Sequence, residues 1–255
     1  WALLEEKHSK TLGDYNTKNT ARWIFHEACM NHNADSNTWL AWAQMEEKYT
    51  GAGDYDNDKN YTARWIFKEA CMNHNADSST WLAWAQMEEK YTGAGDYDND
   101  KNYTARRIFK EACINHNADS YCWRAWAQME EKHSKTAGDY NTKNTARWIF
   151  HEACINRHLT GNVWQLWAQF EQKYSGAGDY NKDYTARWIL RKACVEHNFH
   201  SFVWRDWANL EFQENNIGNL QTENSALWIS AEGIKRFPGD EVLCALNSEM
   251  QKSSS

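Results

Sequence analysis

The chain is built from one segment repeated in tandem, which restricts it to folds that stack copies of a small structural unit. Residues 39–80 and 81–122 are identical at 38 of 42 positions, and later copies diverge gradually. Trp1 occupies the position of Trp42, so we expect the chain to begin inside a helix of a longer array. We divide the sequence into a partial repeat near 1–38, full repeats 39–80, 81–122, 123–163 and 164–203, and an end repeat 204–255.

Each repeat contains two runs with helical spacing. In the first run, Trp81, Trp84, Ala85 and Glu88 fall at i, i+3, i+4 and i+7, which places them on one helix face. The second run, near residues 105–115, spaces its apolar residues in the same way. No segment alternates as a strand does. We therefore predict an all-α fold, a right-handed α-solenoid of antiparallel helix pairs with about five full repeats plus partial ends.

A hydroxyl residue precedes each second run. Ser and Thr are preferred N-caps, because the side-chain oxygen accepts from an otherwise unpaired backbone N–H. The predicted N-caps are Thr20, Thr62, Thr104, Thr145, Thr185 and Ser225.

The 16 tryptophans all fall into three columns set by the repeat. A ligand cage would need tryptophans that converge on one place, whereas a repeated column indicates packing of large aromatic side chains. We therefore predict that all three columns belong to the core, with Arg107 the one exception in the third. The first column is Trp39, Trp81, Trp123, Trp164 and Trp204, the second is Trp1, Trp42, Trp84, Trp126, Trp167 and Trp207, and the third is Trp23, Trp65, Trp148, Trp188 and Trp228.

Five of the seven cysteines follow the repeat, and one repeat is too far apart for bridges. We interpret them as small buried residues in a reducing compartment. Four of them begin a Cys-x-x-His pair, but two ligands per repeat cannot supply the four that zinc needs, so we predict no metal and no other cofactor here. The pairs are Cys29/His32, Cys71/His74, Cys113/His116 and Cys194/His197.

The pattern resembles the half-a-tetratricopeptide (HAT) repeat, and the resemblance covers nearly the whole chain. Two features depart from that family: Pro238 is the only proline, and the loop between the helices is long and acidic. The residues that carry the resemblance are Trp81-x-x-Trp84-Ala85-x-x-Glu88, then Ala105-Arg106-x-Ile108-Phe109-x-x-Ala112. The resemblance implies a non-catalytic scaffold of an RNA-processing or RNA-stabilising assembly, located inside the cell in the nucleus or a plastid.

Two charged columns recur in step with the repeat. An RNA-binding ladder of arginines is one interpretation, but we favour the pairing of each arginine with a glutamate across the helical hairpin, as the HAT pattern suggests. The columns are Arg22, Arg64, Arg106, Arg147 and Arg187, and Glu46, Glu88, Glu130, Glu171 and Glu211.

The exposed side of the first helices is the candidate binding surface. By resemblance, first helices line the concave side of such arrays, where amides are able to bond a peptide backbone or base edges. An ordinary solvated face explains the same residues equally well. The amides are Gln44, Gln86, Gln128, Gln169 and Asn209, and the flanking positions on the same face are Leu40, Leu82, Arg124, Gln165 and Arg205.

The loops of the two most similar repeats carry alternating aspartates, which is the spacing of calcium ligands. An EF-hand also needs Gly at position 6 and Glu at position 12, and these positions hold Lys and Trp or Arg, so turn and cap roles are favoured. The carboxylates are Asp54, Asp56, Asp58, Asp96, Asp98 and Asp100. In the same loops, Asn60 and Asn102 fit the N-glycosylation pattern and matter only if the protein is secreted.

The net charge of −7 argues against a protein whose main role is to coat nucleic acid. Direct RNA binding is therefore possible but not favoured, and we expect a protein partner or a second copy of the chain. No apolar run is long enough for a transmembrane helix, which excludes membrane insertion. The alternative is a self-assembling structural protein, extracellular in that case, because nearly identical repeats can join head to tail into filaments.

Overall fold

The computed structural model describes residues 2–8, 13–54, 61–96, 103–157, 159–197 and 199–253. These residues form helices joined by loops and turns, with no strand among them. The all-α prediction is therefore confirmed for the described part of the chain. They also contain no helix with the length and apolar character needed to span a membrane.

The helices come in pairs along the chain, as the two runs of each repeat predict. The first helices are α1 (Ala2–His8), α3 (Ser36–Thr50), α5 (Ser78–Thr92), α7 (Ser120–Ser134), α9 (Gly161–Ser175) and α11 (Ser201–Gln213). The second helices are α2 (Ala21–His26), α4 (Ala63–Asn73), α6 (Ala105–Lys110), α8 (Ala146–His151), α10 (Ala186–Val195) and α12 (Ala226–Arg236), and α13 (Glu241–Ser253) follows them. Three second helices continue as π-helical turns, at Glu27–Asn31, Glu111–Asn115 and Glu152–Asn156.

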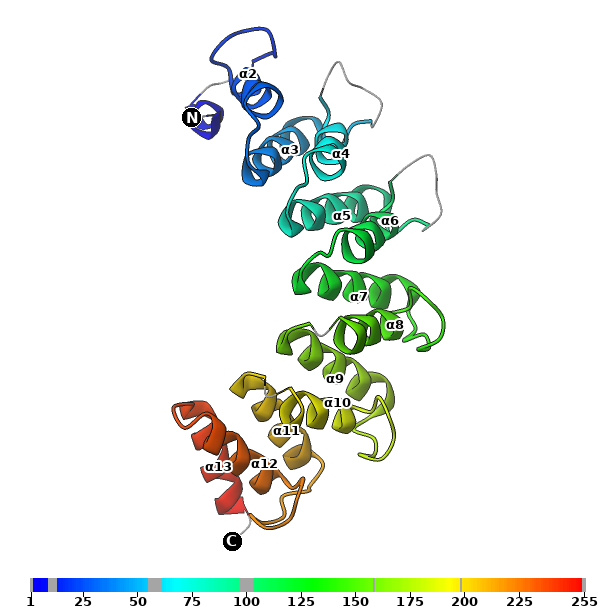
Figure 1. Ribbon diagram of the computed structural model, residues 1–255, viewed down its shortest axis with the longest axis vertical. Coiled ribbons are helices and arrows are strands. Elements are labelled where there is room, and N and C mark those ends of the chain that lie inside the picture. The colour runs from blue at the N-terminus through cyan, green and yellow to red at the C-terminus, as the bar shows by residue number, and fades with distance from the viewer. Residues whose placement is uncertain are drawn as a thin grey trace. The chain divides into compact units, whose positions relative to one another are not determined.

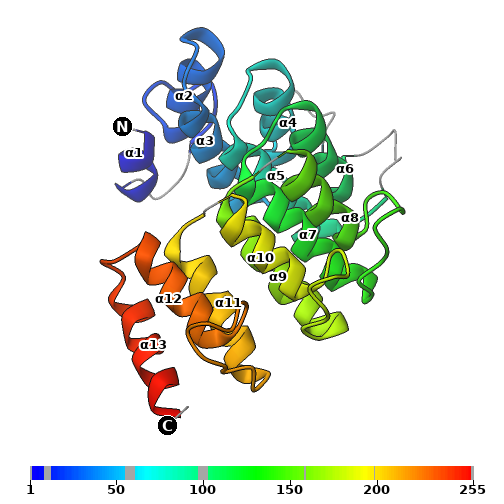
Figure 2. The same cartoon turned by 60° about the horizontal axis from the view of Figure 1, so that its bottom comes forward.

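The chain divides into two compact units, residues 1–129 and 130–255, which we call the N-terminal and C-terminal units. Within the N-terminal unit, α3 packs against α4 and α5, and α5 packs against α6 (Figure 1). Within the C-terminal unit, α9 packs against α10 and α11, and α11 packs against α12 and α13 (Figure 2). The helices α3, α5, α9 and α11 thus each contact the second helix of their own pair, and α3 and α9 also contact the next first helix.

The N-caps of the second helices are confirmed. Each predicted hydroxyl accepts from the backbone N–H three residues later, as Thr185 does from Trp188 at 3.2 Å. The same bond is made by Thr20, Thr62, Thr104, Thr145 and Ser225. A local sequence signal therefore fixes where each second helix begins.

Two of the three tryptophan columns form the core. Every described member of the first and second columns is at most 2% exposed. Trp39 stacks on His74 with ring centroids 4.6 Å apart, and Trp81 lies 4.8 Å from His116 in the equivalent contact. His74, His116 and His197 of the Cys-x-x-His pairs therefore serve as packing partners of the first column.

The core prediction is wrong for the third column, whose members are only half-buried. Two of these tryptophans lie against loop tyrosines: Trp65 contacts Tyr61 edge-on at 5.0 Å, and Trp188 contacts Tyr184 at 5.3 Å. Arg107 takes the same place, with its guanidinium 4.4 Å from the centre of the Tyr103 ring. Helical spacing alone did not separate this outer position from the buried ones.

Two glycines after α9 give a matched test of the loop geometry. Both have positive φ, 71° at Gly176 and 68° at Gly178, but a Cβ at Gly176 would meet nothing within 4 Å. A Cβ at Gly178 would lie 2.6 Å from the Thr185 side chain. We expect Gly176→Ala to cost about 1–3 kcal/mol of unfolding free energy from backbone strain alone, because its φ of 71° and ψ of −170° lie in a region that essentially only glycine adopts. Gly178→Ala should cost at least about 1 kcal/mol more, because overpacking adds to the strain.

Urea unfolding followed by tryptophan fluorescence measures both glycine variants. Equal losses of stability in the two would show that the loop does not pack against the N-cap of α10.

Candidate functional site

The predicted amides lie on the accessible side of the first helices. Gln44, Gln86 and Gln128 are exposed in the N-terminal unit, while in the C-terminal unit Gln169 is exposed and Asn209 is half-buried. We call these five residues the amide set. The flanking residues Leu40, Leu82, Arg124, Gln165 and Arg205 are half-buried.

Charges near the amide set are paired between successive first helices. Lys48 Nζ lies 2.9 Å from Glu6 Oε1, and Lys90 Nζ lies 2.8 Å from Glu47 Oε1. In the C-terminal unit, Lys173 Nζ lies 2.6 Å from Glu131 Oε1. We call these contacts the helix-to-helix ion pairs. They compensate charge locally, so the amides are flanked by paired rather than isolated charges.

Of the two arginines on this side, Arg205 has an acidic partner and Arg124 has an aromatic one. Arg205 Nε lies 3.9 Å from Asp240 Oδ2, and the Arg124 guanidinium lies 5.1 Å from the centre of the Tyr121 ring. Beside Arg205, Asp206 adds a negative charge and accepts from Gln165 Nε2 at 2.7 Å and Gln169 Nε2 at 3.0 Å. Two members of the predicted surface are thus brought together on one carboxylate.

A cavity of about 190 Å³ opens beside this carboxylate. It lies between α9 and α11, with one residue from α10, and we call it the C-terminal pocket. Its polar side chains are two members of the amide set, two further glutamines and one acid, over an apolar floor. The lining residues are Ala168, Gln169, Gln172, Leu190, Asp206, Asn209, Leu210 and Gln213.

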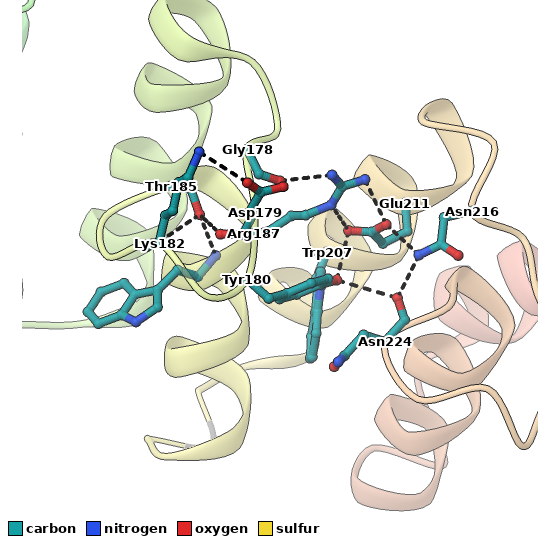
Figure 3. A network of polar contacts seen from close by, with 11 residues as sticks. Gly178, Asp179, Tyr180, Lys182, Thr185, Arg187, Trp207, Glu211, Asn216 and Asn224 are labelled. Atoms are coloured by element: carbon teal, nitrogen blue, oxygen red, sulfur yellow. Dashed lines mark hydrogen bonds and ion pairs between the residues drawn. The ribbon is translucent and has the colours of Figure 1, made fainter.

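The arginine and glutamate columns have a structural role. Arg187 Nε and Nη2 bond the two carboxylate oxygens of Glu211 at 2.7 and 3.1 Å, and Glu211 is 0% exposed (Figure 3). The same contact joins Arg22 to Glu46, Arg64 to Glu88 and Arg147 to Glu171. Pairing of the two columns is therefore confirmed for these four arginines.

The prediction that each pair lies within one helical hairpin is wrong. The pairs connect consecutive repeats. Each arginine bonds the glutamate 24 residues later, on the next first helix. The HAT-like spacing predicted the residue types of each pair correctly but the wrong glutamate. One glutamate precedes each arginine in the sequence and another follows it, so the spacing alone does not decide between them.

At three of these four sites, a loop tyrosine also bonds the glutamate. Tyr180 Oη donates to Glu211 Oε1 at 2.7 Å and accepts from Trp207 Nε1 at 2.8 Å, while the Gly178 carbonyl accepts from Arg187 Nη1 (Figure 3). Burial, and then the bond to Glu211, raises the pKa of Tyr180 far above its usual value, so the phenol remains a donor. Tyr15 and Tyr140 donate to Glu46 and Glu171 in the same way.

The sequence analysis missed these tyrosines. The signal was present, because Gly-Asp-Tyr recurs at 13–15, 53–55, 95–97, 138–140 and 178–180. The loop sequence by itself predicts only turn and cap chemistry. That chemistry is also present: Asp139 accepts from the backbone N–H groups of Asn141 and Thr142 at 2.8 and 2.6 Å.

The calcium alternative is tested only in part. Asp54 and Asp96 are exposed, and their backbone carbonyls accept from the N-cap hydroxyls of Thr62 and Thr104. Asp56, Asp58, Asp98 and Asp100 lie outside the described residues, as do Asn60 and Asn102. Within the described ranges, no three His, Cys, Asp or Glu side chains are grouped as metal ligands.

The repeat cysteines are buried thiols. Cys71, Cys113 and Cys154 are at most 1% exposed. Burial raises the pKa of the Cys29 thiol to about 12, so it stays protonated at neutral pH. Because the thiolate is the reactive form, these cysteines are packing residues rather than nucleophiles.

No known family model matches the chain, and no curated protein shows detectable sequence similarity to it. The likeness to HAT repeats therefore remains a resemblance carried by the repeat pattern.

We expect Glu211→Gln to lower the free energy of unfolding by about 3 kcal/mol, because it leaves the guanidinium of Arg187 partly buried without its counter-charge. Lys173→Gln, which breaks an ion pair with a largely exposed lysine, should cost less than about 1 kcal/mol. Urea unfolding of the two variants compares them directly.

The double variant Glu211→Gln, Arg187→Leu is the control, since Leu227 already occupies the arginine position in the next repeat. It should recover part of the loss. A Glu211→Gln variant as stable as the Lys173→Gln variant would contradict the structural role of the buried pair.

Proposed function

We propose that this chain is a non-catalytic helical-repeat scaffold in which the members of the amide set within each unit bind an extended segment of a partner protein. The observation that carries the proposal is the exposure of an amide at equivalent positions of successive first helices. An amide offers both donors and an acceptor, which matches the alternating N–H and C=O groups of an extended backbone.

The paired charges support a protein partner over RNA. Nucleic-acid binding draws its affinity mainly from cations that neutralise phosphates. Lys48, Lys90 and Lys173, which lie beside members of the amide set, each contact a glutamate, and the chain has a net charge of −7. The HAT resemblance supplies the context that we propose, an RNA-processing or RNA-stabilising assembly inside the cell in which this segment contacts protein.

The second candidate is a self-assembling protein. It is favoured by the 38 identical positions in repeats 39–80 and 81–122, because near-identical repeats present near-identical faces. A head-to-tail contact of this kind is heterologous and need not close into a ring.

Light scattering across protein concentrations, with and without single-stranded RNA at two salt levels, separates the candidates. We expect a constant mass that RNA does not change. Growth with concentration would favour filaments, and an RNA-dependent shift that weakens at high salt would favour a direct RNA binder.

A triple variant tests the surface itself. The variant carries Gln44→Ala, Gln86→Ala and Gln128→Ala. We expect it to bind a partner that copurifies with the native chain at least tenfold more weakly, with no change in the unfolding midpoint. The matched control replaces the exposed amides that end three second-helix runs, Asn31→Ala, Asn73→Ala, Asn115→Ala, and should bind normally. Equal binding by both variants would place the interface elsewhere.

A further inference from the structure

The C-terminal pocket lies where the helix-to-helix ion pairs stop. By repeat alignment, Gln172 occupies the position of Glu6, Glu47 and Glu131, and Gln213 occupies that of Lys48, Lys90 and Lys173. The next ion pair in the series is thus replaced by two glutamines, and both line the pocket. The ion pair that joins successive first helices at this position in other repeats is thus missing beside the cavity.

Asp206 is the second departure at the same place. Its position holds Ala41, Ala83, Ala125 and Leu166 in the earlier repeats, so this repeat alone has a charge there. Gln165 and Gln169 both donate to its Oδ2 atom, which fixes the orientation of the carboxylate. The nearest cation on the same helix, Arg205, lies against Asp240 instead.

The chemistry of the pocket lining matches a side chain with an apolar stem and a cationic end. Ala168, Leu190 and Leu210 provide an apolar floor, and Asp206 with the surrounding amides provides acceptors above it. Arginine combines an aliphatic stem with a planar cation that has five N–H donors, which suits a carboxylate flanked by amide oxygens. The volume of about 190 Å³ is adequate, since a cavity of about 150 Å³ accepts a benzene-sized molecule.

We propose that the C-terminal pocket binds an arginine side chain of an extended partner segment, with the guanidinium on Asp206 and the stem over Leu190 and Leu210. This rests on the proposed function, because Gln169 and Asn209 of the amide set form part of the pocket wall and would bond the backbone beside that arginine. Lysine offers a compact, strongly hydrated charge with three donors, so it should bind less well.

The test is a nuclear magnetic resonance titration of the full chain with acetyl-arginine-methylamide. The side-chain amide signals of Gln169, Gln172, Asn209 and Gln213 should shift and saturate. Acetyl-lysine-methylamide should bind several-fold more weakly, and acetyl-citrulline-methylamide, which is uncharged and nearly isosteric with the arginine probe, at least tenfold more weakly.

Asp206→Ala is a conservative variant for this fold, because three other repeats carry alanine at that position. It should weaken the arginine probe at least tenfold with no change in the unfolding midpoint. Asp183→Asn removes the same charge from an exposed loop residue and should leave binding unchanged. Equal affinity for the arginine and citrulline probes, unchanged binding by Asp206→Ala, or no shift of the pocket signals would each overturn the proposal.

The titration needs no partner protein, so its outcome is separate from that of the amide-set variants. Arginine binding together with normal partner capture by the triple variant would retain the pocket and reject the proposed scaffold surface. No binding of the arginine probe, together with loss of partner capture by the triple variant, would retain the scaffold surface and reject the arginine site.

Discussion

The buried glutamate of the first helices α3, α5, α7, α9 and α11 is the constraint on which these repeats depend. A carboxylate with almost no exposure is costly to desolvate unless its charge is paired and its oxygens accept hydrogen bonds. At Glu211 these requirements are met by Arg187 from the preceding second helix and Tyr180 from the loop before that helix. One buried charge therefore fixes three segments relative to one another across a repeat boundary.

This requirement also explains the long loop that distinguishes the chain from the HAT pattern. The loop before α10 places the Gly178 carbonyl on Arg187 and the Tyr180 hydroxyl between Glu211 and Trp207. Asp179 accepts the N-cap hydroxyl of Thr185 through its backbone carbonyl, so the same loop fixes where the helix begins. The loop is thus part of the contact between repeats.

Local signals in the sequence predicted the elements well. Helical spacing located the helix pairs, the hydroxyl before each second helix identified its cap, and the first two tryptophan columns were correctly assigned to the core. These features depend on residues within a few positions of each other, or on a direct repeat of the same environment. The handedness and the number of stacked repeats remain predictions.

Contacts between elements were harder to predict, and the reason is geometric. Arg187 has a glutamate at a plausible distance in both directions, and only the packing of α10 against α11 decides between Glu171 and Glu211. The third tryptophan column has the same helical spacing as buried residues, yet Trp188 lies beside Tyr184 and is only half-buried. The C-terminal pocket was not predicted from the sequence, because no motif marks it. It lies where Gln172 and Gln213 replace a helix-to-helix ion pair.

The near-identity of the repeats limits which residues are able to determine binding specificity. Equivalent positions in identical repeats offer the same chemistry each time, so they suit a periodic ligand such as an extended backbone but cannot distinguish one segment from another. A departure from the repeat is needed to select a side chain. In the C-terminal unit such departures coincide: Asp206 introduces a charge, and Gln172 and Gln213 remove an ion pair at the same cavity. If the amide set supplies general affinity for extended chain, the residue that enters this pocket determines which segment is bound.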